Sequence, residues 1–194
     1  MAEPARKFDT IEAFLRWERR QEFRHEWEAG VVTAMTGTRV AHNKIVRNLA
    51  RLLDEVPSLR NCLVATESIK VRIGNEALFY PDIVVTCPDI DDDTDIAPNP
   101  ILIAEVLSDS TASADRGRKW LRYQTLRSLR HYVIVWQSAA RIEAYDPDGT
   151  TWRHRTLRGR GATLDLAGID ASLKLEDIYA RTEIGQSKRR PTRA

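Results

Sequence analysis

The sequence predicts a single domain of mixed α/β (α+β) class, in which helices flank a central mixed β-sheet. The chain has 194 residues, a length typical of one domain with one sizeable core. Hydrophobic residues make up 42% of the chain and charged residues 30%, as in ordinary globular proteins. Segments with helical spacing of apolar residues alternate with short apolar runs, in the order helix, hairpin, helix, strands, helix, strands. This order favours a mixed sheet covered by helices.

The first predicted elements are a helix and a hairpin. Phe8–Phe23 carries apolar residues at roughly helical spacing, and Asp9 or Thr10 can cap its N-terminus. Over His25–Met35, two short strand-like runs flank the pair Ala29-Gly30. This pattern predicts a hairpin that turns at Ala29-Gly30.

Residues Val40–Val56 show the clearest helical pattern of the chain. One face of this predicted helix is apolar along its length, and Pro57 ends it. A second face carries a row of basic side chains, at positions i, i+3 and i+7: Lys44, Arg47 and Arg51.

Most of the remaining chain is predicted to form strands. Ile101–Leu107 is almost continuously apolar, which indicates a central strand buried on both faces. A helix over Asp115–Leu126 follows, and residues 8–182 are expected to form the domain, with flexible termini at 1–7 and 184–194. A turn is predicted at residues 146–149. The other predicted elements are Cys62–Ala65, Ser68–Ile73, Ile83–Cys87, His131–Gln137, Ala140–Tyr145, Trp152–Leu157, Leu164–Leu166 and Glu176–Ala180.

The charge distribution argues against a strongly basic nucleic-acid-binding body. The net charge is +2, but residues 184–194 contain four basic residues and no acid: Lys188, Arg189, Arg190 and Arg193. Without these four, 26 basic residues face 28 acidic ones, a net charge of −2. Any interaction with nucleic acid would therefore rely on local basic faces.

The sequence predicts a cytoplasmic protein with no membrane segment. Its apolar runs are far too short to cross a bilayer, and residues 1–7 lack the apolar region of a secretory signal. Cys62 and Cys87 lie in apolar strand-like runs without metal-ligand spacing. We expect them to be buried, reduced thiols.

The main chemical signal is a pair of acids, Asp82 and Glu105. Asp82 opens one apolar strand, and Glu105 interrupts another from within. An acid in an apolar strand is costly to bury unless it is paired or binds a cation. On neighbouring strands the two acids could hold one Mg²⁺, whose ligands are oxygens. The alternative is a buried acid that pairs with an arginine.

Three further residues are weaker candidates. Lys119 lies four residues after Asp115, so the two share a helix face, and the alternative is a surface ion pair. His42, near the start of a predicted helix, could orient a phosphate, or it could simply flank the helix. Glu26 lies in a predicted strand of alternating character, where an exposed acid is the simpler interpretation.

Six segments, taken in order, form a combination found in a known family: His25–Gly30, Ala41–Leu49, Tyr80–Cys87, Ala104–Thr111, Asp115–Trp120 and Tyr123–Trp136. Together they resemble a bacterial family usually described as "putative restriction endonuclease", the Uma-two family of the PD-(D/E)XK nuclease superfamily. The resemblance covers roughly residues 8–182 and implies a restriction-endonuclease-like fold, a central mixed sheet flanked by helices.

The resemblance implies roles for particular residues. Asp82 and Glu105 match the family's metal-binding acids, and the carbonyl of Val106 would complete a Mg²⁺ site in which Mn²⁺ can substitute. The superfamily usually has lysine two residues after the glutamate, where this chain has Leu107. Related members place the lysine on the following helix, where Lys119 matches.

Two more residues match the family. Glu26 matches an acid before the first glycine turn and could serve a second metal position, and His42 matches a histidine at a helix start. The chain departs from the family at Asp109, where proline is frequent. This extra carboxylate could bind metal or repel phosphate.

Two functions follow from the resemblance. The first is Mg²⁺-dependent hydrolysis of DNA phosphodiester bonds by a homodimer, because cutting two strands needs two sites. Lys44, Arg47 and Arg51 could then contact the DNA backbone. The second is a catalytically inactive module of the same fold, associated with mobile DNA. Leu107 and the slightly acidic body favour this second function.

Overall fold

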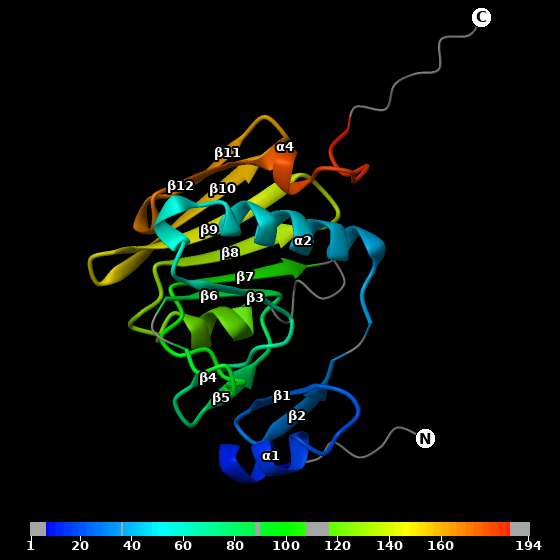
Figure 1. Cartoon of the computed structure of the whole chain (residues 1–194), viewed down its shortest axis with the longest axis vertical. Coiled ribbons are helices and arrows are strands. Elements are labelled where there is room, and N and C mark those ends of the chain that lie inside the picture. Colours follow the sequence, from blue (N-terminus) through cyan, green and yellow to red (C-terminus); the bar gives the residue numbers. More distant parts are fainter. Residues whose placement is uncertain (1–6, 36, 88–89, 108–116, 187–194) are drawn as a thin grey trace, which may run out of the picture.

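The structure is a computed structural model that describes residues 7–35, 37–87, 90–107 and 117–186. In this part of the chain, six strands form a central sheet in the order β10-β9-β8-β7-β6-β3. β7 and β8 are parallel and the other neighbours antiparallel, so the sheet is mixed. Helices flank it (Figure 1), which confirms the predicted fold class. The strands are β3 (Leu63–Thr66), β6 (Ile83–Thr86), β7 (Leu102–Leu107), β8 (His131–Trp136), β9 (Arg141–Asp148) and β10 (Thr151–Arg158).

A second sheet of four strands, in the order β2-β1-β5-β4, lies with α1 (Ile11–Glu18) at the lower end of the molecule in Figure 1. Thr10 caps α1, because its hydroxyl accepts a hydrogen bond from the Ala13 N–H. The β1–β2 turn is at Ala29-Gly30, as predicted, and both residues have positive φ. The strands are β1 (His25–Glu28), β2 (Val31–Ala34), β4 (Val71–Ile73) and β5 (Ala77–Phe79).

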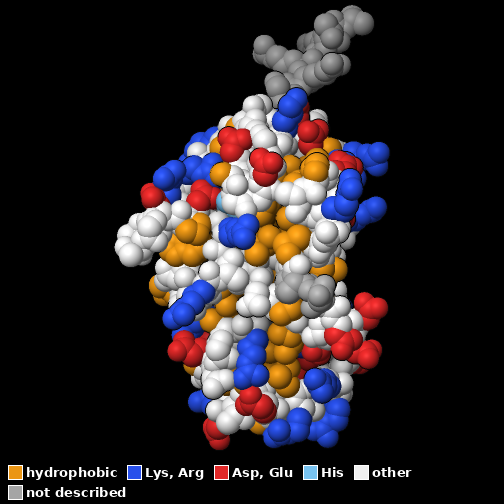
Figure 2. Space-filling model, turned by 60° about the vertical axis from the view of Figure 1, so that its left-hand side comes forward, with side chains coloured by type: hydrophobic (Ala, Val, Ile, Leu, Met, Phe, Trp, Pro, Cys, Tyr) orange, Lys and Arg blue, Asp and Glu red, His pale blue; other side chains and the backbone are white. Residues whose placement is uncertain are grey.

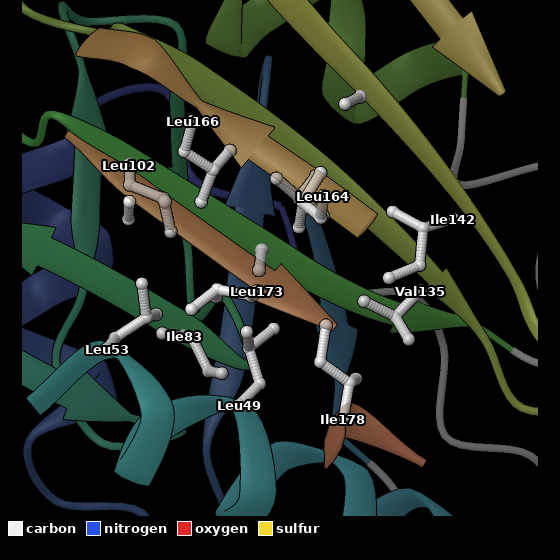
Figure 3. Packing of buried hydrophobic residues seen from close by; sticks show 14 of the residues in the cluster. Leu49, Leu53, Ile83, Leu102, Val135, Ile142, Leu164, Leu166, Leu173 and Ile178 are labelled. Carbon is white, nitrogen blue, oxygen red and sulfur yellow. The ribbon is translucent and has the colours of Figure 1, made fainter. Parts of the chain in front are cut away.

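One face of the central sheet packs against α2 (Val40–Asp54), the helix predicted most clearly. Figure 3 shows Leu49 and Leu53 of α2 beside Ile83 of β6. These side chains are almost completely buried, and each contributes roughly 1.5–3 kcal/mol to folding. The same core includes residues of β11 (Thr163–Leu166), β12 (Ala171–Lys174) and α4 (Leu175–Ile178), with short 3₁₀ turns at Pro57–Leu59 and Ala167–Ile169.

The opposite face is covered by a helix whose described part spans residues 117–123. The Tyr123 ring is fully buried, with its centroid 5.5 Å from that of Phe79 and 5.3 Å from that of Tyr132. Trp120 stacks on Tyr132 at 5.3 Å. Lys119 precedes Tyr123 by four residues and therefore shares its face, toward the sheet. The aromatic packing thus holds Lys119 over the strands.

Sequence patterns missed two strands and displaced one turn. β5 is only three residues long, and all three are buried, so it shows no alternation. β12 is equally hard to recognise at four residues. The turn predicted at residues 146–149 is wrong in position, because β9 continues to Asp148 and only Gly149 and Thr150 connect it to β10. Gly149 has φ of 63°, which suits a two-residue hairpin turn.

The ends of the described chain contact the domain. Lys7 forms a bridge with Val31, and Ile184 packs against the main core. The rest of the predicted flexible termini, residues 1–6 and 187–194, lies outside the described residues. Within the described part, no helix is both long enough and apolar enough to cross a bilayer.

The prediction of reduced, buried cysteines is wrong. Cys62 and Cys87 are half-buried and form a disulfide. Leu63 pairs with Thr86 in the antiparallel β3–β6 ladder, so the two cysteines occupy the next position along it, facing each other. Their sequence separation of 25 hides this register. Disulfides are rare in reducing compartments, so the cysteines give no support to the predicted cytoplasmic location.

Reduction of this disulfide should destabilise the protein. Opening a 25-residue loop restores entropy to the unfolded chain, worth about 3.5 kcal/mol in the loop-closure relation. Urea unfolding followed by tryptophan fluorescence, with and without a phosphine reductant, measures the change. A Cys62→Ser/Cys87→Ser double variant should not respond to reductant. Two free thiols in unreduced, denatured wild-type protein would contradict the disulfide.

Candidate functional site

Three carboxylates form a row across three neighbouring strands. Thr66 pairs with Ile83 and Ile83 with Ala104, so the next positions along β3, β6 and β7 are Glu67, Asp82 and Glu105. The Glu67 N–H donates to the Asp82 carbonyl at 3.2 Å, which extends the β3–β6 ladder to this row. Residues directly opposite in antiparallel strands are near neighbours. The register therefore gathers acids that lie far apart in the sequence.

Asp82 is fixed at the centre of this row by β7. Its Oδ2 accepts a hydrogen bond of 2.6 Å from the Val106 N–H. The N–H and C=O of one strand residue point toward the same neighbouring strand, so the Val106 carbonyl is also directed to the Asp82 side. Both predicted metal-ligand side chains and the predicted backbone ligand therefore converge.

Glu105 is only 3% exposed and its Oε1 has two donors. The Lys119 ammonium lies 3.3 Å from this oxygen, and the Tyr123 hydroxyl donates to it at 3.0 Å. Burial is the largest influence and raises the pKa of Glu105 to about 8. Lys119 opposes this shift, while the carboxylates of Asp82 and Glu26 add to it.

Lys119 is held between acids from both sheets. Its Nζ lies 2.8 Å from Oε1 of Glu26 in β1, as well as against Glu105 in β7. Burial by itself lowers the pKa of Lys119, but the charges of Glu105 and Glu26 outweigh burial and raise it. Lys119 is therefore an ammonium. The same Glu26 oxygen accepts a hydrogen bond of 3.1 Å from the Tyr80 N–H, which fixes its position.

His42 approaches the row from the first turn of α2. Its Nε2 lies 3.2 Å from Oδ1 of Asp82 and 3.4 Å from Oε1 of Glu67. Burial lowers the pKa of His42, but the two carboxylates outweigh it and raise the pKa. Ligand atoms of His42, Glu67 and Asp82 all lie within 4.8 Å of one another, so this group could hold a metal ion.

These groups line one pocket of about 570 Å³ between the two sheets. All six predicted site residues, including Val106, are among its walls, and so is the missed Glu67. Other lining residues come from β2 and from the segment before α2, and the pocket wall also includes Arg39, Arg118 and Gln137. Acids, an ammonium and an imidazole thus face the same space, which makes this pocket the candidate functional site.

The structure decides between several interpretations that the sequence left open. Among the described residues, the buried Glu105 pairs with Lys119 and with no arginine, and Glu26 is buried, not exposed. Lys119 is therefore not part of a solvated surface pair. Asp109 and Asp115 lie outside the described residues.

Sequence reasoning missed Glu67. It follows β3 and precedes β4, so an acid there looks like an ordinary turn residue. Its φ of 53° is uncommon for a residue with a side chain and frequently marks a functional position. No sequence pattern reports this backbone conformation.

Comparison with known proteins identifies the family of the chain. The family model Uma2, described as "Putative restriction endonuclease", matches residues 11–176. The chain belongs to the Uma2 family. The resemblance noted in the sequence is thereby confirmed.

Relatives of this Uma2 chain share its length as well as its sequence. The chain is 31% identical over 166 residues to the protein sll1609 of Synechocystis sp., which covers 83% of this chain and 94% of that protein. It is also 31% identical over 171 residues to slr1290 of the same organism, covering 87% and 90% respectively. Both relatives are described as uncharacterized.

A solved structure shares the fold. A crystal structure from Anabaena variabilis, titled as a "putative nuclease belonging to DUF820", superposes with a TM-score of 0.72 at 16% identity. The match covers 88% of this chain and 97% of that one. At this identity the likeness establishes the fold alone.

The raised pKa of Glu105 predicts a pH-dependent stability of the metal-free protein. Below its ordinary pKa of 4.5, Glu105 is protonated in both states, whereas up to about pH 8 only the folded state keeps the proton. The stabilisation from this proton is therefore lost as pH rises from about 4.5 to 8. Wild type should lose free energy of unfolding relative to Glu105→Gln across this range. Urea unfolding in the presence of EDTA at several pH values measures this loss. If the free energies of unfolding of wild type and Glu105→Gln change in parallel with pH, the pKa of Glu105 is not raised.

Proposed function

We propose that this Uma2 chain is a metal-dependent nuclease that hydrolyses DNA phosphodiester bonds. The observation that carries the proposal is the buried Lys119 ammonium, which contacts Glu105 beside Asp82 in an open pocket. Buried charges are costly to maintain, and a fold has little structural reason to gather them around a cavity. Phosphoryl transfer uses such groups, because charge develops on the phosphate oxygens during the reaction.

The oxygen ligands fit a hard divalent cation. Asp82, Glu105 and the Val106 carbonyl would hold Mg²⁺, for which Mn²⁺ can substitute, and neither side chain is blocked by an arginine among the described residues. When bound, the cation lowers the pKa of a coordinated water and polarises the phosphate. The Val106 N–H keeps Oδ2 of Asp82 in place, and the Tyr123 hydroxyl keeps Oε1 of Glu105 in place. Both acids are thus oriented before any ligand arrives.

Lys119 would act on the substrate directly. Its ammonium can donate to a phosphate oxygen as negative charge grows there, or orient the attacking water. Glu26 is a positioning residue in this scheme, because its Oε1 holds the ammonium at 2.8 Å. The earlier prediction that Glu26 serves a second metal position gains no support from these contacts, since this oxygen already accepts from Lys119 and from the Tyr80 N–H.

A basic groove beside the pocket suits a nucleic-acid backbone. The row predicted on α2 lines a groove of about 890 Å³ together with Arg181 and with Thr66 of β3. Thr66 precedes Glu67, and Lys44 follows His42 by two residues, so the groove adjoins the acids. On the face that Figure 2 shows, charges of both signs are interspersed, whereas this row brings three basic side chains to one groove, so we take it as the candidate for phosphate contacts.

The alternative of a catalytically inactive module rested on the absence of lysine at position 107 and on the slightly acidic body. Lys119 supplies an ammonium to Glu105 from the neighbouring helix, so the substitution by Leu107 does not remove the cation. The contacts therefore favour the enzyme. A homodimer and a cytoplasmic location stay predictions, and light scattering coupled to gel filtration would test the dimer.

Removal of either acid should abolish cleavage. Asp82→Ala and Glu105→Ala each delete a proposed cation ligand. Lys119→Met deletes the charge that stabilises the phosphate, so it should slow cleavage by about 10²–10³-fold. Single- and double-stranded DNA incubated with Mg²⁺ or Mn²⁺ provide the assay. Asp148→Asn, an exposed acid at the β9–β10 turn, is the control and should cleave normally. Wild-type activity in both alanine variants would exclude the proposed site.

Substitutions in the basic groove should weaken DNA binding without regard to sequence. Arg47→Ala and Arg51→Ala each remove a proposed phosphate contact, and each should reduce the slope of log affinity against log salt by about one. Fluorescence anisotropy at several salt concentrations, with a catalytically inactive background variant, measures this. Arg153→Ala on β10 is the matched control. If it weakens DNA binding as much as the groove variants do, the DNA backbone does not bind specifically in the groove.

A further inference from the structure

The proposed nuclease site gives no role to an imidazole and a carboxylate of the pocket, those of His42 and Glu67. Nε2 of His42 lies close to both Glu67 and Asp82. Oδ2 of Asp82 accepts from the Val106 N–H, whereas Oδ1 lies 3.2 Å from Nε2 of His42. Asp82 can therefore face two positions at once, one beside Glu105 and one beside His42.

His42 is the second, independent sign of a ligand at this place. The residue is 6% exposed, and its Nε2 is buried. Although this nitrogen lies near Asp82 and Glu67, it makes no hydrogen bond of acceptable geometry to them or to any other described residue. A buried ring nitrogen that faces two carboxylate oxygens without a well-formed hydrogen bond to either is uncommon, and a cation between the three groups would give each of them a partner.

We propose that His42, Glu67 and Asp82 form a second cation position that takes a divalent first-row transition metal. It shares Asp82 with the position formed by Asp82, Glu105 and the Val106 carbonyl. Ligand atoms of the three residues lie within 4.8 Å of one another, a span that one ion can bridge. Glu67 is one-third exposed, so the position is open to the pocket on that side.

The ligand chemistry separates the two positions. Imidazole nitrogen suits first-row transition metals such as Fe²⁺ and Zn²⁺, and Mn²⁺, the weakest binder of that series, still accepts it more readily than Mg²⁺, which prefers an octahedron of oxygens. The position with His42 should therefore retain Mn²⁺ in the presence of excess Mg²⁺. At the all-oxygen position with Glu105, Mg²⁺ should replace Mn²⁺ more readily.

The charge of the pocket also favours a cation. Its four acids, Glu26, Glu67, Asp82 and Glu105, outnumber the three permanently basic side chains of its wall, Arg39, Arg118 and Lys119. With all of these groups ionised, the pocket is therefore net negative and attracts a divalent ion.

The rival interpretation is that His42 is a protonated imidazole held between Asp82 and Glu67 by charge alone. Electron paramagnetic resonance of the full chain with Mn²⁺ distinguishes the two. Free Mn²⁺ is counted in a titration of wild type, His42→Gln, Glu67→Gln and Glu105→Gln. Spin-echo modulation of the bound ion then reports whether a nitrogen nucleus ligates it.

We expect wild type to bind two Mn²⁺ and each of the three variants to bind one. Nitrogen modulation should be present in wild type and in Glu105→Gln, and lost in His42→Gln. It should persist in wild type under excess Mg²⁺, with one Mn²⁺ retained. His154→Gln, a more exposed histidine that also contacts a carboxylate, is the matched control and should keep both ions.

Several results would overturn the proposal: no nitrogen modulation in wild type, two ions retained by His42→Gln, or displacement of both ions by Mg²⁺. If His42→Gln does not fold, the wild-type modulation and the Glu67→Gln stoichiometry still decide. The inference rests on the proposed function for what the ions do, but its readout is binding. Two ions without DNA cleavage would refute the nuclease alone, and cleavage with a single nitrogen-free ion would refute the second position alone.

Discussion

The buried ion pairs of Lys119 are the interaction on which the arrangement of the whole molecule depends. This one ammonium joins Glu26 of the small sheet to Glu105 of the central sheet, from a helix that belongs to neither. A buried ammonium without partners would be strongly unfavourable, and so would two buried carboxylates without a cation. The small sheet, the central sheet and the helix must therefore meet in one relative position. The pocket lies where they meet.

The same charges limit how stable the site can be. Burial raises the pKa of Glu105 to about 8, so the fold opposes its ionisation even with Lys119 beside it. The row of Glu67, Asp82 and Glu105 concentrates like charges on adjacent strands, where direct opposition is destabilising. Ligands that bring positive charge would relieve this repulsion. An unfavourable arrangement of this kind is typical of functional sites and is tolerated because rigid surroundings, here the aromatic packing of Trp120 and Tyr123, hold it in place.

The comparisons show which features survive sequence divergence. At 16% identity the Anabaena variabilis structure still shares the fold over 88% of this chain, so the strand order and packing do not require particular core residues. The arrangement of the three carboxylates, in contrast, requires particular strand registers. Asp82 meets Glu67 and Glu105 only while both β3–β6 and β6–β7 keep their registers, since a slip by one residue would turn these side chains to the other face. The Cys62–Cys87 disulfide ties β3 to β6 at the far end of the same ladder.

The sequence alone determined the fold class, the long α2 helix and the β1–β2 hairpin, because these depend on local periodicity and turn residues. It also pointed to Asp82 and Glu105, because an acid within an apolar strand is conspicuous. It did not reveal Glu67, whose position depends on the β3–β6 register and on a left-handed backbone conformation. Nor did it reveal the disulfide, or that Lys119 reaches Glu105 and Glu26 at once. Those contacts join residues 14 and 93 positions apart, and the packing of a helix against two sheets decides them, which no local pattern encodes.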